Sequence, residues 1–132
     1  MSLSRLLAAF AVALSLTSVS PAFAAPASKG AITSVNVVAK PANYSGDCPA
    51  ALEFVGTIKV SKFPAVVEYL WERSNGTRTS VRRIEVRSGT QKITDEWGVG
   101  GAPGTMQVWE KLKILSPATL SSAMAKATVN CK

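Results

Sequence analysis

Short segments in which hydrophobic and polar residues alternate make up most of the chain after residue 31. In the segment 52–60, Phe54 and Ile58 fall on one face, and Glu53 and Lys59 fall on the other. Alternation with a period of two is typical of a β-strand that has one buried face and one solvated face. The pattern predicts strands at 32–39, 52–60, 65–73, 81–87, 91–99, 106–115 and 123–131.

Turn residues separate these segments. Ser74-Asn75-Gly76 predicts a tight turn because Asn-Gly tolerates positive φ, and the stretches 43–49 and 98–104 predict loops. About seven strands in about 100 residues predict an all-β fold, an immunoglobulin-like antiparallel β-sandwich. A small closed barrel is the alternative fold, and a helix competes with a strand only at 120–127.

The apolar face of each predicted strand indicates which side chains fill the core. Tyr69 and Trp71 share such a face in one strand, and the other strands contribute aliphatic and aromatic side chains in the same way. The predicted core residues are Phe54, Ile58, Tyr69, Trp71, Leu112 and Ile114.

The first residues have the order of a secretory signal peptide. Arg5 supplies a positive charge, the apolar run 6–16 follows, and small residues end it at Ala22-Phe23-Ala24. We expect cleavage after Ala24, or else after Ala25, rather than an uncleaved membrane anchor, because a bilayer span needs roughly 20 apolar residues. The expected organisation is a cleaved signal peptide (1–24), a flexible leader (25–31) and one domain (32–132) that is secreted or periplasmic.

The amino-acid composition limits which disulfides, metal sites and catalytic residues the chain can have. The chain has two cysteines, Cys48 and Cys131, and an even count in an exported protein favours one disulfide. A metal site is a poor alternative, because the chain has no histidine and two thiolates do not complete a tetrahedral zinc site. The commonest general base is also missing, so we expect no catalytic residue and no cofactor, and we do not expect an enzyme.

Adjacent Asp95 and Glu96 point to opposite faces of a strand, and we interpret them as ordinary strand-end charges.

Several of these residues together are similar to a known group of proteins. The pattern consists of Cys48-Pro49, Phe54-x-Gly56-x-Ile58, Tyr69-x-Trp71, Trp97, Trp109-x-x-Leu112-x-Ile114-x-x-Pro117 and Cys131. It resembles a loose group of secreted bacterial immunoglobulin-like domains of mostly unassigned role, over about residues 32–131. The resemblance implies an extracytoplasmic sandwich in which Cys48 pairs with Cys131, and it implies no activity.

A cluster of arginines is the strongest local charge feature. The formal net charge of +7 falls to +6 when the signal peptide and its Arg5 are removed. Guanidinium groups bind phosphate and carboxylate bidentately, so the cluster is a candidate anion-binding surface, and a solvated hairpin edge is the alternative. Its members are Arg73, Arg78, Arg82, Arg83 and Arg87.

A second candidate surface follows if the strands at 65–73 and 106–115 are neighbours in one sheet. Val66, Leu70 and Trp109 would then form an exposed apolar patch, of the kind that often marks a partner site. The alternatives are cover by a loop and a β-bulge that turns Trp109 inward. Glu110 falls among the inward residues of its strand, and a β-bulge there would resolve the conflict.

These observations favour a secreted or periplasmic, non-enzymatic binding module that engages a partner through a sheet surface or its loops. The alternatives are a structural or adhesive subunit of a surface assembly, which would use an edge strand, and an anion-binding protein that uses the arginines. The sequence does not identify the partner, which is expected to be another protein or an anionic polymer or surface.

Overall fold

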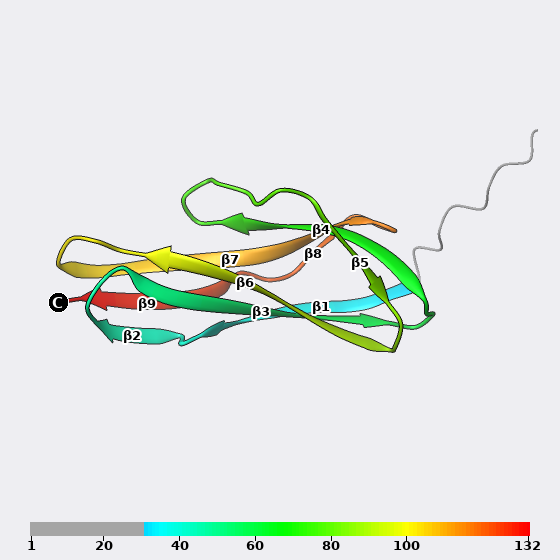
Figure 1. Ribbon diagram of the computed structural model, residues 1–132, viewed down its shortest axis with the longest axis horizontal. Helices are drawn as coiled ribbons and strands as arrows, with labels where there is room; N and C mark the ends of the chain where they lie inside the picture. Colours follow the sequence, from blue (N-terminus) through cyan, green and yellow to red (C-terminus); the bar gives the residue numbers. More distant parts are fainter. Residues whose placement is uncertain (1–30) are drawn as a thin grey trace, which may run out of the picture.

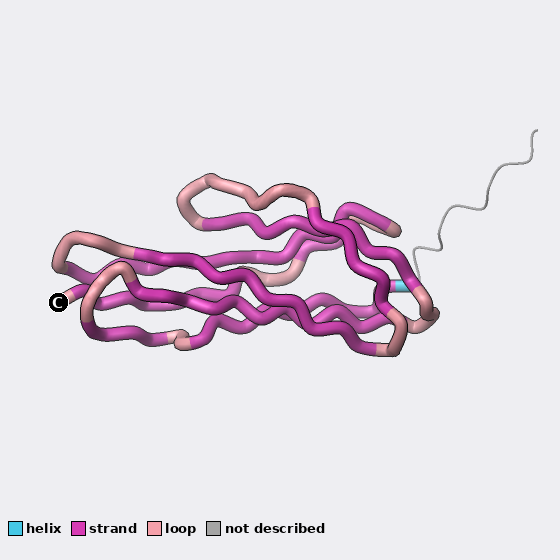
Figure 2. The backbone as a smooth tube through the Cα atoms, viewed as in Figure 1, coloured by secondary structure: helices cyan, strands magenta, loops and turns pink. Residues whose placement is uncertain are grey.

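The computed structural model describes residues 31–132, and most of them lie in strands (Figures 1 and 2). The strands are β1 (Ile32–Lys40), β2 (Asn43–Gly46), β3 (Ala50–Val60), β4 (Ala65–Arg73), β5 (Arg82–Val86), β6 (Thr90–Val99), β7 (Gly104–Ser116), β8 (Leu120–Ser121) and β9 (Ala125–Cys131). The all-β prediction is confirmed, and the main strands lie within a few residues of their predicted positions.

The strands form two sheets. The first sheet has the order β1-β3-β6, and the second has the order β2-β9-β7-β4-β5, with β8 beside β7. Neighbouring strands are antiparallel except for β2 and β9, which are parallel. Figure 1 shows long strands of both sheets running the length of the molecule, with the C-terminus at one end and the β3–β4 connection at the other.

Two short strands were not expected from the sequence. Residues 43–49 were predicted to be a loop, but β2 pairs with the last strand, where the Thr128 N–H donates to the Ala42 carbonyl oxygen (2.8 Å) and the Lys132 N–H to the Gly46 carbonyl oxygen (3.0 Å). The second is β8, which lies in the segment 120–127 where a helix was considered. The helix is absent, because Ser122 exchanges hydrogen bonds with the backbone of Leu112 and keeps this segment beside β7. The structure therefore has nine strands between residues 31 and 132, where about seven were predicted.

The core lies between the two sheets. The six side chains that alternation placed there are all buried, and Trp71, Phe54, Ile58, Leu112 and Ile114 are each at 0% exposure. Gly56 makes room for the indole: a Cβ at this position would lie 3.1 Å from Trp71 Cη2 and 3.0 Å from Leu112 Cδ2. Since protein cores are close-packed, a side chain at position 56 would displace part of this cluster.

One disulfide joins Cys48, in the connection between β2 and β3, to Cys131 at the end of β9. The predicted bond is confirmed, and it ties the last strand to an early loop across a sequence separation of 83 residues. Gly100 packs directly on it with φ +86°, and a Cβ there would lie 2.6 Å from the Cys131 sulfur. Both the backbone conformation and the contact therefore favour glycine at this position.

The predicted signal peptide and most of the predicted leader lie outside the described residues. The leader was expected to extend to residue 31, but Ala31 is buried and its carbonyl oxygen accepts a hydrogen bond from the Ser61 N–H (2.8 Å). The ordered domain therefore includes Ala31. Residues 31–132 contain no helix of the length and hydrophobicity needed to cross a membrane.

Candidate functional site

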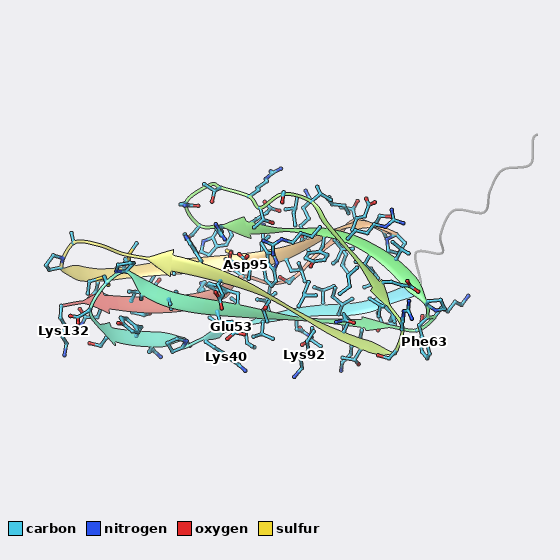
Figure 3. All side chains as sticks on the ribbon, in the orientation of Figure 1. Lys40, Glu53, Phe63, Lys92, Asp95 and Lys132 are labelled. Atoms are coloured by element: carbon cyan, nitrogen blue, oxygen red, sulfur yellow. A yellow bond between two sulfur atoms is a disulfide. The ribbon has the colours of Figure 1, made fainter. Side chains whose placement is uncertain are left out.

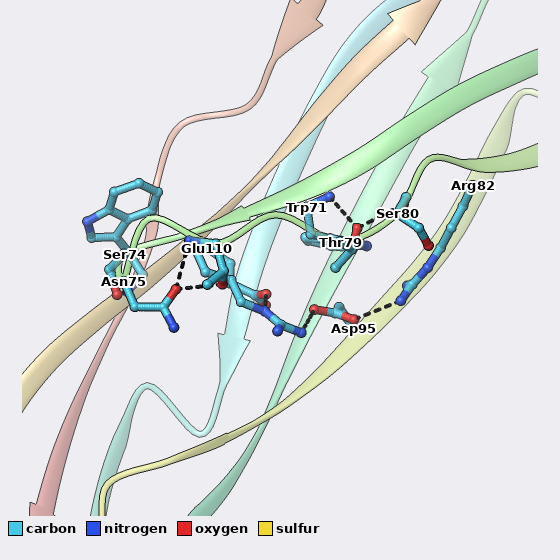
Figure 4. Close-up of polar contacts among 11 residues, drawn as sticks. Trp71, Ser74, Asn75, Thr79, Ser80, Arg82, Asp95 and Glu110 are labelled. Carbon is cyan, nitrogen blue, oxygen red and sulfur yellow. Dashed lines mark hydrogen bonds and ion pairs between the residues drawn. The ribbon is translucent and has the colours of Figure 1, made fainter.

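Four charged side chains from the two sheets meet between them (Figure 4). From β4, the Nη2 of Arg73 donates to Asp95 Oδ2 on β6, and its Nε donates to Glu110 Oε1 on β7, both at 2.8 Å. From the edge strand β5, Arg82 reaches the other carboxylate oxygen of Asp95 at 3.3 Å. We call these four residues the arginine–carboxylate cluster. It joins the two sheets at the side of the sandwich where β5 and β6 form the edges.

The two acids of the cluster are buried, at 5% exposure for Asp95 and 0% for Glu110. Burial raises the pKa of Glu110 to about 8, and its hydrogen bond to Asp95 adds to the rise, while Arg73 opposes it. Burial also acts to raise the pKa of Asp95, but hydrogen bonds from Glu110 and Arg73 outweigh it and hold this pKa below its ordinary value. Glu110 is therefore protonated near neutral pH and Asp95 is ionised. The Oε2 atom of Glu110 is buried and has no hydrogen-bond partner among the described residues.

The cluster corrects two predictions. Asp95 is not a strand-end charge, because β6 extends from Thr90 to Val99 and Asp95 lies in its interior on the inward face. Glu110 is not turned outward by a bulge, because β7 keeps its register with β9 and β4 at this point, and the shift in register lies further along, where Ser116 pairs with Glu68. The sequence did contain a signal: Asp95 and Glu110 each lie two positions from an apolar residue of the inward face of the strand.

The raised pKa of Glu110 makes stability depend on pH. In the unfolded chain this carboxyl has its ordinary pKa near 4.5, so between that value and about 8 the folded protein holds one proton more than the unfolded chain. Stability must then fall as pH rises, by up to about 1.4 kcal/mol per pH unit, and the contribution is lost above pH 8. We expect the free energy of unfolding, measured in urea at pH 6, 7 and 8, to fall by about 2 kcal/mol over this window in the wild type.

The Glu110→Gln variant tests whether this residue is the cause. Glutamine is a neutral isostere that does not titrate, so the fall with pH should largely disappear. Glu96→Gln, which removes an exposed carboxylate from the same region, should keep the wild-type slope. If the wild type and Glu110→Gln respond equally to pH, Glu110 is ionised in the folded protein.

The predicted arginine cluster does not form one surface. Arg73 and Arg82 point inward to the buried carboxylates, whereas Arg78 pairs with Glu72 (3.8 Å) and Arg87 with Glu85 (3.4 Å). Arg83 is exposed and forms no ion pair with any residue between 31 and 132. Of the five predicted residues, only Arg83 presents a guanidinium group that is not already neutralised by a carboxylate in the described part of the chain.

The predicted apolar face is also divided. Strands β4 and β7 are neighbours as expected, and Val66 is exposed, but Leu70 is buried at 8% exposure and Trp109 is half-buried. Leu70 lies on a central strand, with β5 on one side and β7 on the other, and pairs in register with Lys113. The prediction that Leu70 is exposed is therefore wrong, because neighbouring side chains on both sides cover a central-strand residue.

Val66, from the predicted apolar face, and Arg83, from the predicted arginine cluster, line the same hollow. The hollow has a volume of about 390 Å³ and lies where the outer face of the second sheet meets the β3–β4 connection. Val66 and Glu68 from β4, Arg83 from β5 and Ser116 from the end of β7 form its floor. The register shift in β7 places Ser116 opposite Glu68, so this end of β7 belongs to the outer face. The remaining lining residues are Ala31, Lys62, Pro64, Ala65 and Pro117.

The hollow combines charge with apolar surface. Lys62, like Arg83, is exposed and forms no ion pair among residues 31–132. Phe63, between Lys62 and Pro64, is 56% exposed and lies at the same end of the molecule (Figure 3). Sequence reasoning missed Lys62, Phe63 and Ser116 because the loop and strand ends that carry them come together only in the folded chain. The arrangement suits a partner that presents an anionic group beside an apolar one.

Comparison with known proteins does not add to this picture. No protein-family model matches the chain, and no curated protein sequence matches it. Within residues 31–132, no group of three or more acidic or cysteine side chains is placed to hold a metal ion.

Proposed function

We propose that the protein is a secreted or periplasmic, non-enzymatic binding module with an immunoglobulin-like sandwich fold, whose partner contacts the hollow. The observation that carries the proposal is a pair of cations that form no ion pair among the described residues, Arg83 and Lys62, beside exposed Val66 and Phe63 at one end of the sandwich. Glu68, which pairs in register with Arg83, is the one carboxylate that lines the hollow. Concave surface with a few polar groups and apolar walls is the usual form of a binding site.

The strand order supports the immunoglobulin-like part of the proposal. In such domains two antiparallel sheets pack face to face, and a tryptophan on one central strand is buried in the core. The second sheet here has β4 in an interior position, and its Trp71 is completely buried. The disulfide departs from the antibody pattern, since it joins the β2–β3 connection to the end of β9 and not two strands across the core.

The disulfide supports the proposed location, because disulfides form and persist in oxidising compartments such as the periplasm and the extracellular space. The loops at the end of a sandwich support the proposed mode of binding, since connecting segments on a rigid scaffold often carry binding residues.

Site-specific photo-crosslinking tests the proposed surface. A photoreactive phenylalanine analogue at position 63 should give a discrete adduct after irradiation in the native envelope or culture medium. The matched control carries the same analogue at position 94, because Thr94 is exposed on the outer face of the first sheet, and it should give no such adduct. Adding Arg83→Gln to the position-63 protein should reduce the adduct. Equal adducts from both positions, or none from position 63, would reject the hollow as the binding surface.

A further inference from the structure

No lysine among residues 31–132 forms an ion pair, whereas four of the five arginines there do. All five ion pairs among residues 31–132 are made by arginine, and none involves a lysine. A lysine on a sheet face without a carboxylate partner is available to an external anion. The position of these lysines on the two sheets therefore decides where an anion would bind.

Three of them surround Trp109 on the outer face of the second sheet. Lys126 on β9 pairs in register with Trp109, and the Nζ of Lys111 lies 5.7 Å from the centroid of the Trp109 ring. Lys113 lies two residues beyond Lys111 on β7, on the same face and about 7 Å from it along the strand. We call Trp109, Lys111, Lys113 and Lys126 the Trp109–lysine face.

Two carboxylates of β4, Glu68 and Glu72, lie beside this face, and Glu68 pairs in register with Arg83 and Ser116 at the hollow. Glu72 pairs in register with Lys111, but its carboxylate faces Arg78 at 3.8 Å. The cation–π contact with Trp109 holds the Lys111 ammonium in place, and such contacts are worth about 0.5–1 kcal/mol at exposed sites. The face therefore presents three lysines that form no ion pair among residues 31–132, with Lys111 held over the Trp109 ring.

The first sheet has no equivalent surface. Its outer face carries Lys40, Lys59 and Lys92, but Glu53 and Glu96 lie among them, and Lys40, Glu53 and Glu96 follow one another in register across the sheet. Three lysines are thus offset by two carboxylates. On the outer face of the second sheet, Glu72 and Glu85 are paired with Arg78 and Arg87, so Glu68 is the one carboxylate there without an ion pair among the described residues.

We propose that the Trp109–lysine face binds an anionic polysaccharide, a chain of sugars that carry carboxylate groups. The lysines come from the neighbouring strands β7 and β9 and follow β7 along the sheet, which suits a linear polymer and not a small ligand, and Glu68 and Arg83 lie beyond Lys113 toward the hollow. Single-stranded nucleic acids are usually held by several aromatic side chains that stack on successive bases. Here Trp109 is the only aromatic residue of the face, and Lys111 lies over its ring.

This inference rests on the proposed function because it uses the same side of the second sheet, but it concerns different residues. The probe is polygalacturonate, with neutral dextran as the control polymer. The variant Lys111→Gln/Lys113→Gln/Lys126→Gln should bind polygalacturonate about tenfold more weakly than the wild type at low salt, which corresponds to roughly 1.4 kcal/mol. The charge-matched variant Lys40→Gln/Lys59→Gln/Lys92→Gln removes the same three charges from the opposite sheet and should change affinity by less than about twofold.

Three results would overturn the proposal. One is that the wild type binds polygalacturonate no better than dextran, and another is that the two triple variants lose affinity equally, which would make the effect one of net charge only. Binding of a thymidine oligonucleotide of matched charge as tightly as polygalacturonate would instead assign the face to nucleic acid. In each case an adduct at position 63 would still be expected, so failure here is distinct from failure of the hollow as a binding surface.

Discussion

Replacing Arg73 with methionine is expected to lower the free energy of unfolding by about 3–5 kcal/mol, which is the usual cost of removing one partner from a buried charged group. Methionine keeps an unbranched apolar stem in place of the arginine stem but lacks the guanidinium group and its charge. Of its two ion pairs, Asp95 would keep only the longer one, to Arg82, and Glu110 Oε1 would lose its donor. Equilibrium unfolding in urea at pH 7 measures the loss directly.

The matched control is Arg87→Met. Arg87 is an arginine of the same hairpin, but its side chain is 80% exposed and its ion pair with Glu85 is 3.4 Å long. Exposed pairs of this kind contribute about 0–1 kcal/mol, so this variant should be close to the wild type. If Arg73→Met costs no more than Arg87→Met, the cluster does not hold the sheets together.

A compensated variant separates the loss of the charge from the loss of packing. In Arg73→Met/Asp95→Leu/Glu110→Met, no carboxylate remains to be left without a partner. Apolar replacement of a whole buried ionic group is often neutral or stabilising, by about 1–4 kcal/mol. We therefore expect the triple variant to recover most of the stability that Arg73→Met loses. Failure to recover it would mean that packing by the Arg73 side chain, including its contact with Trp97 at 5.3 Å, dominates.

The strands and the core were largely predictable because burial of one face imposes alternation along the chain. Phe54, Ile58 and Trp71 each lie two positions from another residue of the same inward face, and each is fully buried. β2 was not predictable in this way, since Asn43–Gly46 is short and lacks a hydrophobic face. Its strand conformation comes from hydrogen bonds to β9, which is more than 80 residues away in the sequence.

The candidate sites were only partly predictable, because they depend on register between distant strands. The local sequence places Arg73 beside other arginines and Asp95 beside Glu96, and both groupings suggested surface charge. In the fold, Arg73 and Asp95 come from different sheets and meet in the interior. Val66 and Arg83 belonged to two separate predictions, and the antiparallel pairing of β4 with β5 places them at the same hollow.

Loss of the disulfide is expected to have an equally large effect. Removing the Cys48–Cys131 bond should lower the free energy of unfolding by about 4.5 kcal/mol, on the model in which a cross-link restricts the unfolded chain. The reason is the long loop of 83 residues that the bond closes, which spans most of the described domain. This loss is a large share of the roughly 5–15 kcal/mol that stabilises a typical domain, so the reduced protein should unfold at much lower urea concentration.

Two measurements distinguish the cross-link from the packing of its sulfur atoms. Reduction of the wild type breaks the bond and leaves both sulfurs in place, whereas Cys48→Ala/Cys131→Ala also removes the sulfurs, one of which is buried against Gly100. If chain restriction dominates, the two proteins should lose nearly the same stability. A much larger loss in the double variant would assign the effect to packing around Gly100, and a loss below about 1 kcal/mol in both would show that the unfolded chain gains little freedom when the bond is absent.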